Sequence, residues 1–190
     1  MARFKRRSTR LGGYNYSEPG AYFVTVCVRD RKCLLGEVKN GTTRLNQSGK
    51  IVLNIWNELP GRFPFVEIDE FVVMPNHIHG IIVLIDDVGA PFMAPGENKS
   101  ILLPQGESER GAINRAPTLG NVVRAFKGAS TRLVRASGLS QFSWQRNYYE
   151  HVIRNESELF QTRQYIQENP LKWDLDPENP SIGLLSSVSV

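Results

Sequence analysis

Two histidines one residue apart, His77 and His79, form the pattern in this chain that most directly suggests chemistry. They follow the turn-like segment Met74-Pro75-Asn76 and open an apolar run that continues to Ile85. Alternate residues of a strand share a face, so both imidazoles should point the same way. Neutral imidazoles bind divalent metals, usually with a further oxygen or nitrogen ligand. The pair predicts either a single-metal site with open positions or two structural histidines with partners in the core.

A helix expected to begin at Asn155 and end before Pro170 supplies complementary groups. On it, Tyr165 and Asn169 lie four residues apart and therefore share one stripe. One interpretation is a half-buried tyrosine beside a C-terminal asparagine. The other makes Tyr165 a nucleophile and Asn169 the third metal ligand. A phenol near pKa 10 is a weak nucleophile, so it would need a metal-polarised phosphate or a nearby base. Its attack on a phosphodiester would be reversible, as strand transfer requires.

Tyr148 and Tyr149 are rival nucleophiles because they stand near a third histidine, His151. Adjacent residues of a strand point to opposite faces, so at most one of the two could face the site. Tyr165 is preferred because its partner four residues on is a ligand-type residue. His151 could orient a phosphate, assist proton transfer or be structural.

Positive charge is unevenly distributed in this chain of 190 residues, which has 23 Lys and Arg, 19 Asp and Glu, and a net charge of +4. The N-terminal arm combines cations with Tyr14 and Tyr16, as in single-strand binders. A predicted helix over 119–136 carries cations and no acids, which favours phosphate contacts over an ordinary solvated face. The candidate nucleic-acid-binding residues are Arg3, Arg6, Arg7, Arg10, Arg124, Lys127, Arg132 and Arg135.

The elements that must position these residues follow from residue periodicity. Apolar, β-branched and aromatic runs predict a hairpin of strands 21–28 and 33–38, and further strands over 67–74, 77–85 and 142–153. Helical spacing predicts a helix over 46–59 besides the two already named. Strand 77–85 is apolar on both faces, so it should be central and covered by helices on at least one side. Strand pairs interleaved with helices indicate an α+β fold, an antiparallel sheet with helices packed on it.

The chain reads as one domain with appendages. We expect a basic arm over 1–20, a domain over 21–175 interrupted by a long flexible loop over 86–117, and a C-terminal tail over 176–190. Neither a signal peptide nor a run of about 20 apolar residues occurs, so we expect no membrane span. Two cysteines with no metal-ligand spacing favour a reducing cytoplasm.

Three motifs in order resemble the single-tyrosine transposases of the His-hydrophobe-His superfamily, and more narrowly the REP-associated tyrosine transposases. The motifs are Met74 to Gly80, Trp144 to His151 and Tyr165 to Pro170, with further similarity from Arg6 to Leu11 and from Gly20 to Thr25. The likeness runs from about residue 6 to 173 without the 86–117 loop. It implies a ferredoxin-like sheet with helices on one side.

The resemblance also implies activity on single-stranded or hairpin DNA at short repeated palindromes. His77, His79 and Asn169 would hold Mg²⁺ or Mn²⁺, and Tyr165 would form a 5′-phosphotyrosine and free a 3′-hydroxyl. Relatives that are insertion-sequence transposases usually have Gln in place of Asn169. A prokaryotic, nucleoid-associated location follows, and both a monomer and a homodimer stay open. The alternatives are a hairpin-binding regulator that does not cut and a self-mobilising insertion-sequence transposase.

Overall fold

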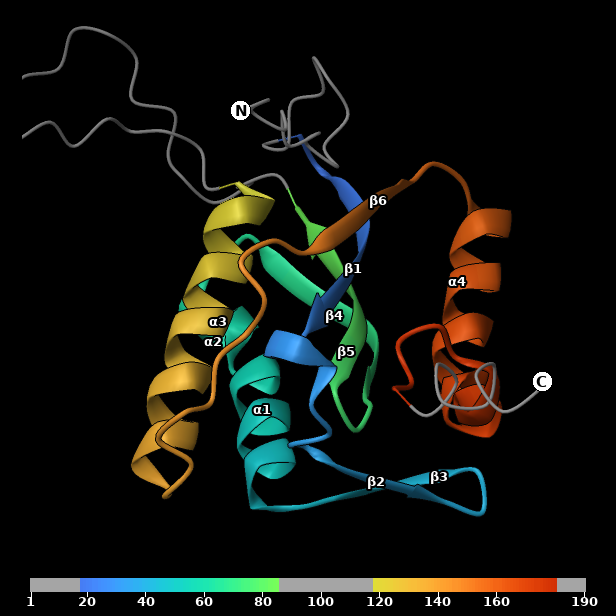
Figure 1. The fold of residues 1–190 in the computed structure, drawn as a ribbon. Helices are drawn as coiled ribbons and strands as arrows, with labels where there is room; N and C mark the ends of the chain where they lie inside the picture. The colour runs from blue at the N-terminus through green and yellow to red at the C-terminus, as the bar shows by residue number, and fades with distance from the viewer. Residues whose placement is uncertain (1–17, 86–117, 181–190) are drawn as a thin grey trace, which may run out of the picture.

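The computed structural model describes residues 18–85 and 118–180 and centres on a four-stranded antiparallel sheet (Figure 1). The strand order is β4-β5-β1-β6, and β2 and β3 form a separate two-stranded sheet. The strands are β1 (Gly20–Cys27), β2 (Gly36–Lys39), β3 (Thr42–Leu45), β4 (Val66–Val73), β5 (His77–Leu84) and β6 (Tyr149–Ile153). The helices are α1 (Gln47–Asn57), α2 (Leu59–Arg62), α3 (Leu119–Ala136) and α4 (Glu156–Glu168), with 3₁₀ helices η1 (Arg29–Arg31) and η2 (Asn169–Leu175). The predicted α+β class is confirmed.

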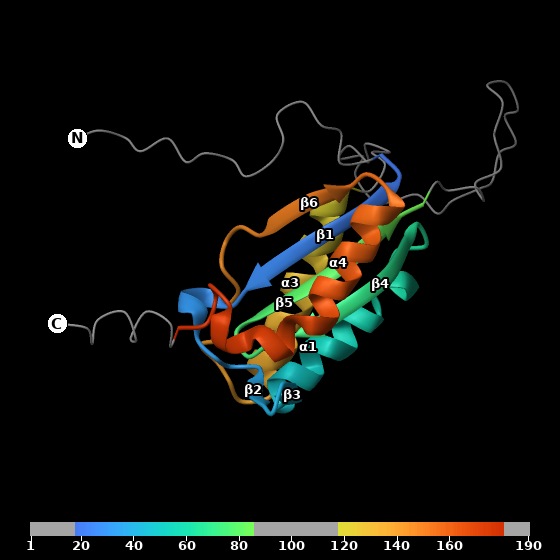
Figure 2. The ribbon, with the colours of Figure 1, turned by 90° about the vertical axis from the view of Figure 1, so that its right-hand side faces the viewer.

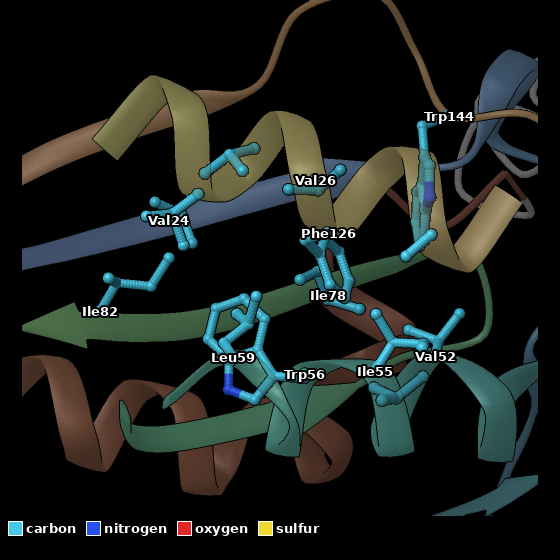
Figure 3. Packing of buried hydrophobic residues seen from close by; sticks show 14 of the residues in the cluster. Val24, Val26, Val52, Ile55, Trp56, Leu59, Ile78, Ile82, Phe126 and Trp144 are labelled. Carbon is cyan, nitrogen blue, oxygen red and sulfur yellow. The ribbon is translucent and has the colours of Figure 1, made fainter. Parts of the chain in front are cut away.

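Helices cover both faces of the sheet. Helices α1 and α3 lie on one face and α4 lies on the other (Figures 1 and 2). The main core fills the first face, where Val24 and Ile82 of the sheet meet Trp56 and Phe126 of the helices (Figure 3). The second face has a smaller cluster centred on Ile81, Ile153 and Ile166. The expectation of helices on one side is therefore wrong for α4.

Strand β5 is central, as its two apolar faces predicted. It pairs with β1 on one side and with β4 on the other, and nearly all of its residues are buried. Because strand side chains alternate, the odd-numbered residues of β5 and β1 point to the α4 face. That parity puts His77 and His79 under α4.

The predicted hairpin of 21–28 with 33–38 is wrong. Strand β1 pairs with β5 and β6, while β2 pairs with β3. Residues Asp30 and Arg31 have φ of 58° and 53°, so the backbone leaves the sheet after β1 instead of turning back along it. Both edges of β1 are then free for longer partners, which bury more of its apolar surface.

The predicted strand over 142–153 shortens to β6. Before β6, the Lys127 ammonium donates hydrogen bonds to the carbonyls of Gln145 (2.6 Å) and Arg146 (3.1 Å). These carbonyls are held toward α3 and cannot form a regular ladder. The predicted 46–59 helix also divides, into α1 and the short α2.

Side-chain caps begin the helices where the sequence indicated. The Asn155 side chain accepts a hydrogen bond from the Glu158 backbone N–H at 2.9 Å, and Asn46 caps α1 in the same way. Capping satisfies a backbone donor that the first turn leaves unpaired. The cap at Asn155 fixes where α4 starts, and hence which residues of α4 face the sheet.

Replacing Gly80 by alanine should destabilise the fold, because a Cβ there would lie 2.4 Å from the Trp56 ring, which is itself stacked on Phe71. Overpacking of this kind costs about 1–3 kcal/mol of unfolding free energy. Gly128→Ala is the matched control, since a Cβ at that position in α3 meets nothing within 4 Å. It should be neutral or stabilising by about 0.5–1 kcal/mol. Urea unfolding of both variants tests the packing, and equal stability of the two would contradict it.

Candidate metal and tyrosine site

The strand register gathers the candidate side chains on one face of the sheet. In the β1–β5 ladder, Thr25 stands opposite His79 and Cys27 opposite His77. In the β1–β6 ladder, Phe23 stands opposite His151 and Thr25 opposite Tyr149. These odd-numbered residues share the α4 face. The fold thus brings together two histidines that are near in sequence and a third that is far away.

The two imidazoles of β5 converge on a single point. Their Nε2 atoms lie 3.0 Å apart, and the rings meet at an interplanar angle of 68°. Two nitrogen ligands at right angles, each about 2.1 Å from a metal ion, would be separated by about 3.0 Å. The histidines are 0% and 4% exposed. Their geometry therefore fits a pair of ligands to one divalent cation.

A buried asparagine fixes the orientation of His77. Asn76 Nδ2 donates to the carbonyls of Arg31 (3.0 Å) and Glu178 (2.6 Å), which leaves Oδ1 to accept from His77 Nδ1 at 2.8 Å. With the proton on Nδ1, His77 Nε2 keeps its lone pair. Thr25 Oγ1 lies 2.8 Å from His79 Nδ1 and can serve either tautomer, because a hydroxyl both donates and accepts.

Burial keeps both imidazoles neutral. It lowers the pKa of His77 to about 4, with the charge of Asp176 opposing the shift and that of Arg31 adding to it. Burial also holds the pKa of His79 well below its usual value, and His77 adds to that effect. A neutral imidazole is the form that binds a metal, so no proton has to leave before binding at neutral pH.

A buried carboxylate oxygen lies beside this pair of imidazoles, and a buried amide oxygen belongs to Asn169, whose side chain contacts Tyr165. Asp176 Oδ2 lies 3.6 Å from His77 Nε2, and ligand atoms of His77, His79 and Asp176 all lie within 4.8 Å of one another. Within the described part of the chain, neither Asp176 Oδ2 nor Asn169 Oδ1 has a hydrogen-bond partner, although both atoms are buried. A buried carboxylate oxygen without a partner is costly, and a cation would satisfy it. The residues present therefore fit a divalent metal.

Asp176 is the residue that the sequence did not reveal, since it falls in the predicted tail. The 3₁₀ helix η2 carries the chain back to the sheet, where the Trp173 ring lies 6.1 Å from the His77 ring. The Trp173 carbonyl then accepts a hydrogen bond from the Asp176 backbone N–H. No motif spacing connects this aspartate to the histidines. Trp173, a large aromatic residue beyond Pro170, was a signal that this segment packs on the domain.

Tyr165 lies against the imidazole pair. Its hydroxyl is 3.3 Å from His79 Nε2, and its ring packs edge-on to Phe23 with centroids 5.9 Å apart. Burial raises the pKa of Tyr165, the charges of Asp176 and Glu178 add to the rise, and the Asn169 amide opposes it. The phenol is thus protonated at neutral pH, and a nearby positive charge would be needed to make it nucleophilic.

Ion pairs and hydrogen bonds fasten α4 over the site. The Arg163 guanidinium donates to both oxygens of Asp69 on β4, at 2.8 and 2.5 Å, and Gln167 donates to Glu70. The Arg163 pair lowers the pKa of Asp69. Two-pronged contacts of this kind restrict orientation as well as distance. They hold the helix that carries Tyr165 against the chain's own sheet.

The two rival tyrosines lie on opposite faces of the sheet, as their adjacency predicted. Tyr148 is partly buried against the main core on the α1 and α3 side. Tyr149 faces the α4 side, is 51% exposed, and lies edge-on to Phe23 with centroids 6.3 Å apart.

His151 is held by a carboxylate beside Tyr165. Its Nε2 lies 2.5 Å from Glu158 Oε1, while Glu158 Oε2 accepts from the Arg154 backbone N–H. These bonds lower the pKa of Glu158, the backbone one most strongly. A pocket of about 260 Å³ joins the pair to Tyr165; its lining residues are Phe23, His151, Glu158, Gln161, Thr162 and Tyr165.

The predicted cationic face of α3 lies across the sheet from the histidines. A pocket of about 680 Å³ is lined by all four predicted cations of this helix and by Arg146. Two of the four have structural contacts: Lys127 binds backbone carbonyls, and Arg135 Nε donates to the Phe142 carbonyl at 2.8 Å. Arg124 and Arg132 are exposed. The arm residues Arg3, Arg6, Arg7 and Arg10, the 86–117 loop and residues 181–190 of the tail lie outside the described residues.

Comparison with solved structures identifies the class of fold. A REP-associated tyrosine transposase, solved bound to a REP hairpin, superposes with a TM-score of 0.52 at 24% identity, covering 91% of this chain and 74% of that one. This chain and that transposase therefore share a fold. No protein-family model matches the chain. Within the described residues, no helix has the length and apolar character to cross a membrane.

A sequence relative defines the family more narrowly. An uncharacterized protein of Haemophilus influenzae (strain Rd) is 42% identical over 171 residues, which cover 90% of this chain and 91% of that protein. The chain belongs to the same family as that protein.

Asn76→Ala should weaken Mn²⁺ binding about 10- to 100-fold, because removal of a residue that orients a metal-binding histidine typically has this effect. Calorimetric titration of the folded variant measures the change. Asn54→Ala, at an exposed position of α1, is the control and should bind as wild type does. Wild-type affinity in a folded Asn76→Ala variant would contradict the assigned orientation of His77.

The metal-free protein should lose stability as the pH falls from about 6.5 toward 4. In that window the unfolded chain protonates His77 at its ordinary pKa, whereas the folded chain does so only near pH 4. The unfolding free energy should drop by up to about 1.4 kcal/mol per pH unit for each such imidazole. Urea unfolding with a chelator present measures this slope. His77→Gln should reduce it by one imidazole's share, and an unchanged slope would refute the buried neutral state.

Proposed function

We propose that this protein is a metal-dependent tyrosine transposase that nicks and rejoins single-stranded DNA. The observation that carries the proposal is the 3.3 Å approach of the Tyr165 hydroxyl to His79 Nε2, beside the converging imidazole nitrogens. A phenol poised at a cation site is suited to attack an anionic phosphodiester, the electrophile that such a cation would draw in. The structural likeness to a REP-associated tyrosine transposase supports the same conclusion.

His77 and His79 would hold Mg²⁺ or Mn²⁺, with an oxygen from Asp176 or Asn169 as the third ligand. When bound, the cation supplies positive charge that stabilises the phosphate as negative charge builds up on it. The two oxygens differ in consequence: a carboxylate neutralises one charge of the cation, whereas an amide leaves it more electrophilic.

Tyr165 would act as the nucleophile. Its oxygen bonds to phosphorus while the bond from phosphorus to the 3′-oxygen breaks. The 5′-phosphate then remains on the tyrosine, and the departing 3′-oxygen takes a proton to become a hydroxyl. His151, which Glu158 holds in the adjoining pocket, would assist the transfer of the phenol proton. Attack by a 3′-hydroxyl on the phosphotyrosine reverses these steps and joins the strands.

The substrate we propose is a short palindromic DNA hairpin with single-stranded flanks. The transposase whose fold this chain shares was solved bound to a REP hairpin, which supports this choice. Arg124, Arg132 and Arg146, which line the pocket beside α3, would contact duplex phosphates. The basic arm over 1–20 would bind the flanking strand. These partners imply action at the nucleoid of a prokaryotic cell.

A second candidate is a hairpin-binding regulator that does not cut. The observation that favours it is the enclosure of His77, which is fully buried with Asp176 and Trp173 against it. If this arrangement is kept when DNA binds, a phosphate reaches the imidazole pair only from the side of His79 and Tyr165, and His77 stays closed to it.

A covalent-capture assay separates these candidates. Hairpin oligonucleotides with randomised stems and flanks, labelled at the 3′ end, are incubated with the protein and Mn²⁺. We expect a protease-sensitive adduct that keeps the 3′ label, together with an unlabelled fragment ending in a 3′-hydroxyl. Tyr165→Phe should form none, whereas Tyr148→Phe and Tyr149→Phe should form it. Retention of DNA by the wild type without any adduct would support the regulator, and an adduct in Tyr165→Phe would refute the assigned nucleophile.

A further inference from the structure

An exposed aromatic surface lies beside Tyr165 at the β6 edge of the sheet. Phe23 of β1 is its centre, with the Tyr149 ring edge-on at 6.3 Å and the Tyr165 ring edge-on at 5.9 Å. Tyr149 is 51% exposed and Tyr165 is 44% exposed. Tyr149 therefore displays a half-exposed ring on the α4 face of the sheet, and aromatic rings displayed on a sheet are a common platform for unpaired bases.

The pocket of about 260 Å³ opens next to this surface. It is smaller than the roughly 300–1,000 Å³ of pockets that take drug-sized ligands, so it suits a single flat ring system. Phe23 and Tyr165 contribute aromatic walls, and Gln161, Thr162 and His151 contribute polar groups. None of the described residues that line it is Lys or Arg. A phosphate group would lack a counter-charge there, whereas a neutral base with a polar edge would find both kinds of contact.

Helix geometry connects the pocket to the candidate nucleophile. One stripe of α4 faces β1 and β6 and lines the pocket; its residues are Glu158, Gln161, Thr162 and Tyr165. Because Tyr165 ends this stripe, the pocket extends to the phenol. Arg163 and Gln167 bind the same helix to β4, which holds the helical wall of the pocket in place against the sheet. A nucleotide joined to a phosphate at the Tyr165 hydroxyl would have its base within reach of this pocket.

We propose that the pocket binds the base of an unpaired nucleotide adjacent to the phosphate at Tyr165, and that Tyr149 stacks on the neighbouring base. The inference rests on the proposed function, because it assumes that Tyr165 meets a single DNA strand. Gln161 presents an amide that both donates and accepts, and it reads the edge of the bound base. A base that is paired in a duplex cannot enter, so the pocket selects single-stranded DNA at the point of attack.

Equilibrium binding with chelator present tests the inference apart from any cleavage. The probes are a fluorescein-labelled twelve-residue oligothymidylate and a strand of equal length made of abasic residues, read by fluorescence anisotropy at low salt. Wild type should bind the oligothymidylate at least about tenfold more tightly than the abasic strand, given the usual stacking contribution of a base on an aromatic ring. Tyr149→Ala should lose about tenfold on the first probe and nothing on the second. Tyr149→Phe, which keeps the ring, should bind as wild type does.

Phe160→Ala is the matched control, since Phe160 is an aromatic of α4 that is 66% exposed and is not among the residues lining the pocket. It should leave the affinity for both probes unchanged. Equal affinity of Tyr149→Ala and wild type for the oligothymidylate would overturn the inference, and so would equal binding of the two probes by wild type. Neither result would affect the covalent-capture assay, which tests the proposed function independently. If Tyr149→Ala loses affinity for the oligothymidylate alone, but the wild type forms no covalent adduct, the base site is upheld and the cleavage chemistry is rejected.

Discussion

The approach of two neutral imidazole nitrogens to 3.0 Å inside the protein is the interaction on which the rest of the site depends. Two protonated histidines would repel each other at that distance, so the arrangement requires a surrounding that excludes the charged form. The position of the pair on central strand β5 provides this surrounding, because α4 and η2 cover the face of the strand on which the two histidines lie. Asn76 and Thr25 orient the two imidazole rings by hydrogen bonds to the Nδ1 atoms of His77 and His79. The Nε2 atoms of both rings are thereby directed at the same point.

The same enclosure explains how the chain presents a phenol to the candidate metal site. Tyr165 has a raised pKa and is inert by itself, but it sits on a helix fixed by the Asp69–Arg163 pair at the distance of a hydrogen bond from His79. Asp176 Oδ2 and Asn169 Oδ1 have no hydrogen-bond partner among the described residues, and leaving buried oxygens unpaired is unfavourable. A cation bound beside the imidazoles would satisfy Asp176 Oδ2.

Local patterns of the sequence predicted much of this arrangement. The His-x-His spacing and the apolar faces of β5 indicated the strand and its central place. The four-residue spacing put Tyr165 of α4 on one stripe with Asn169, the residue that caps the end of this helix. Features that depend on long-range packing were missed. The positive φ of Asp30 and Arg31 diverts β1 from the nearest strand, and the bonds that Lys127 donates to the backbone before β6 follow from no local pattern. Asp176 reaches His77 only because η2 returns the chain to the sheet, and no spacing rule encodes that return.

Anomalous diffraction from crystals of the Tyr165→Phe variant, grown with Mn²⁺, would test the central claim most directly. The account predicts one strong manganese peak within bonding distance of Nε2 of both His77 and His79, with an oxygen of Asp176 or Asn169 completing the protein ligands. A map without manganese at these nitrogens, in which the two imidazoles remain hydrogen-bonded to each other at saturating Mn²⁺, would contradict it.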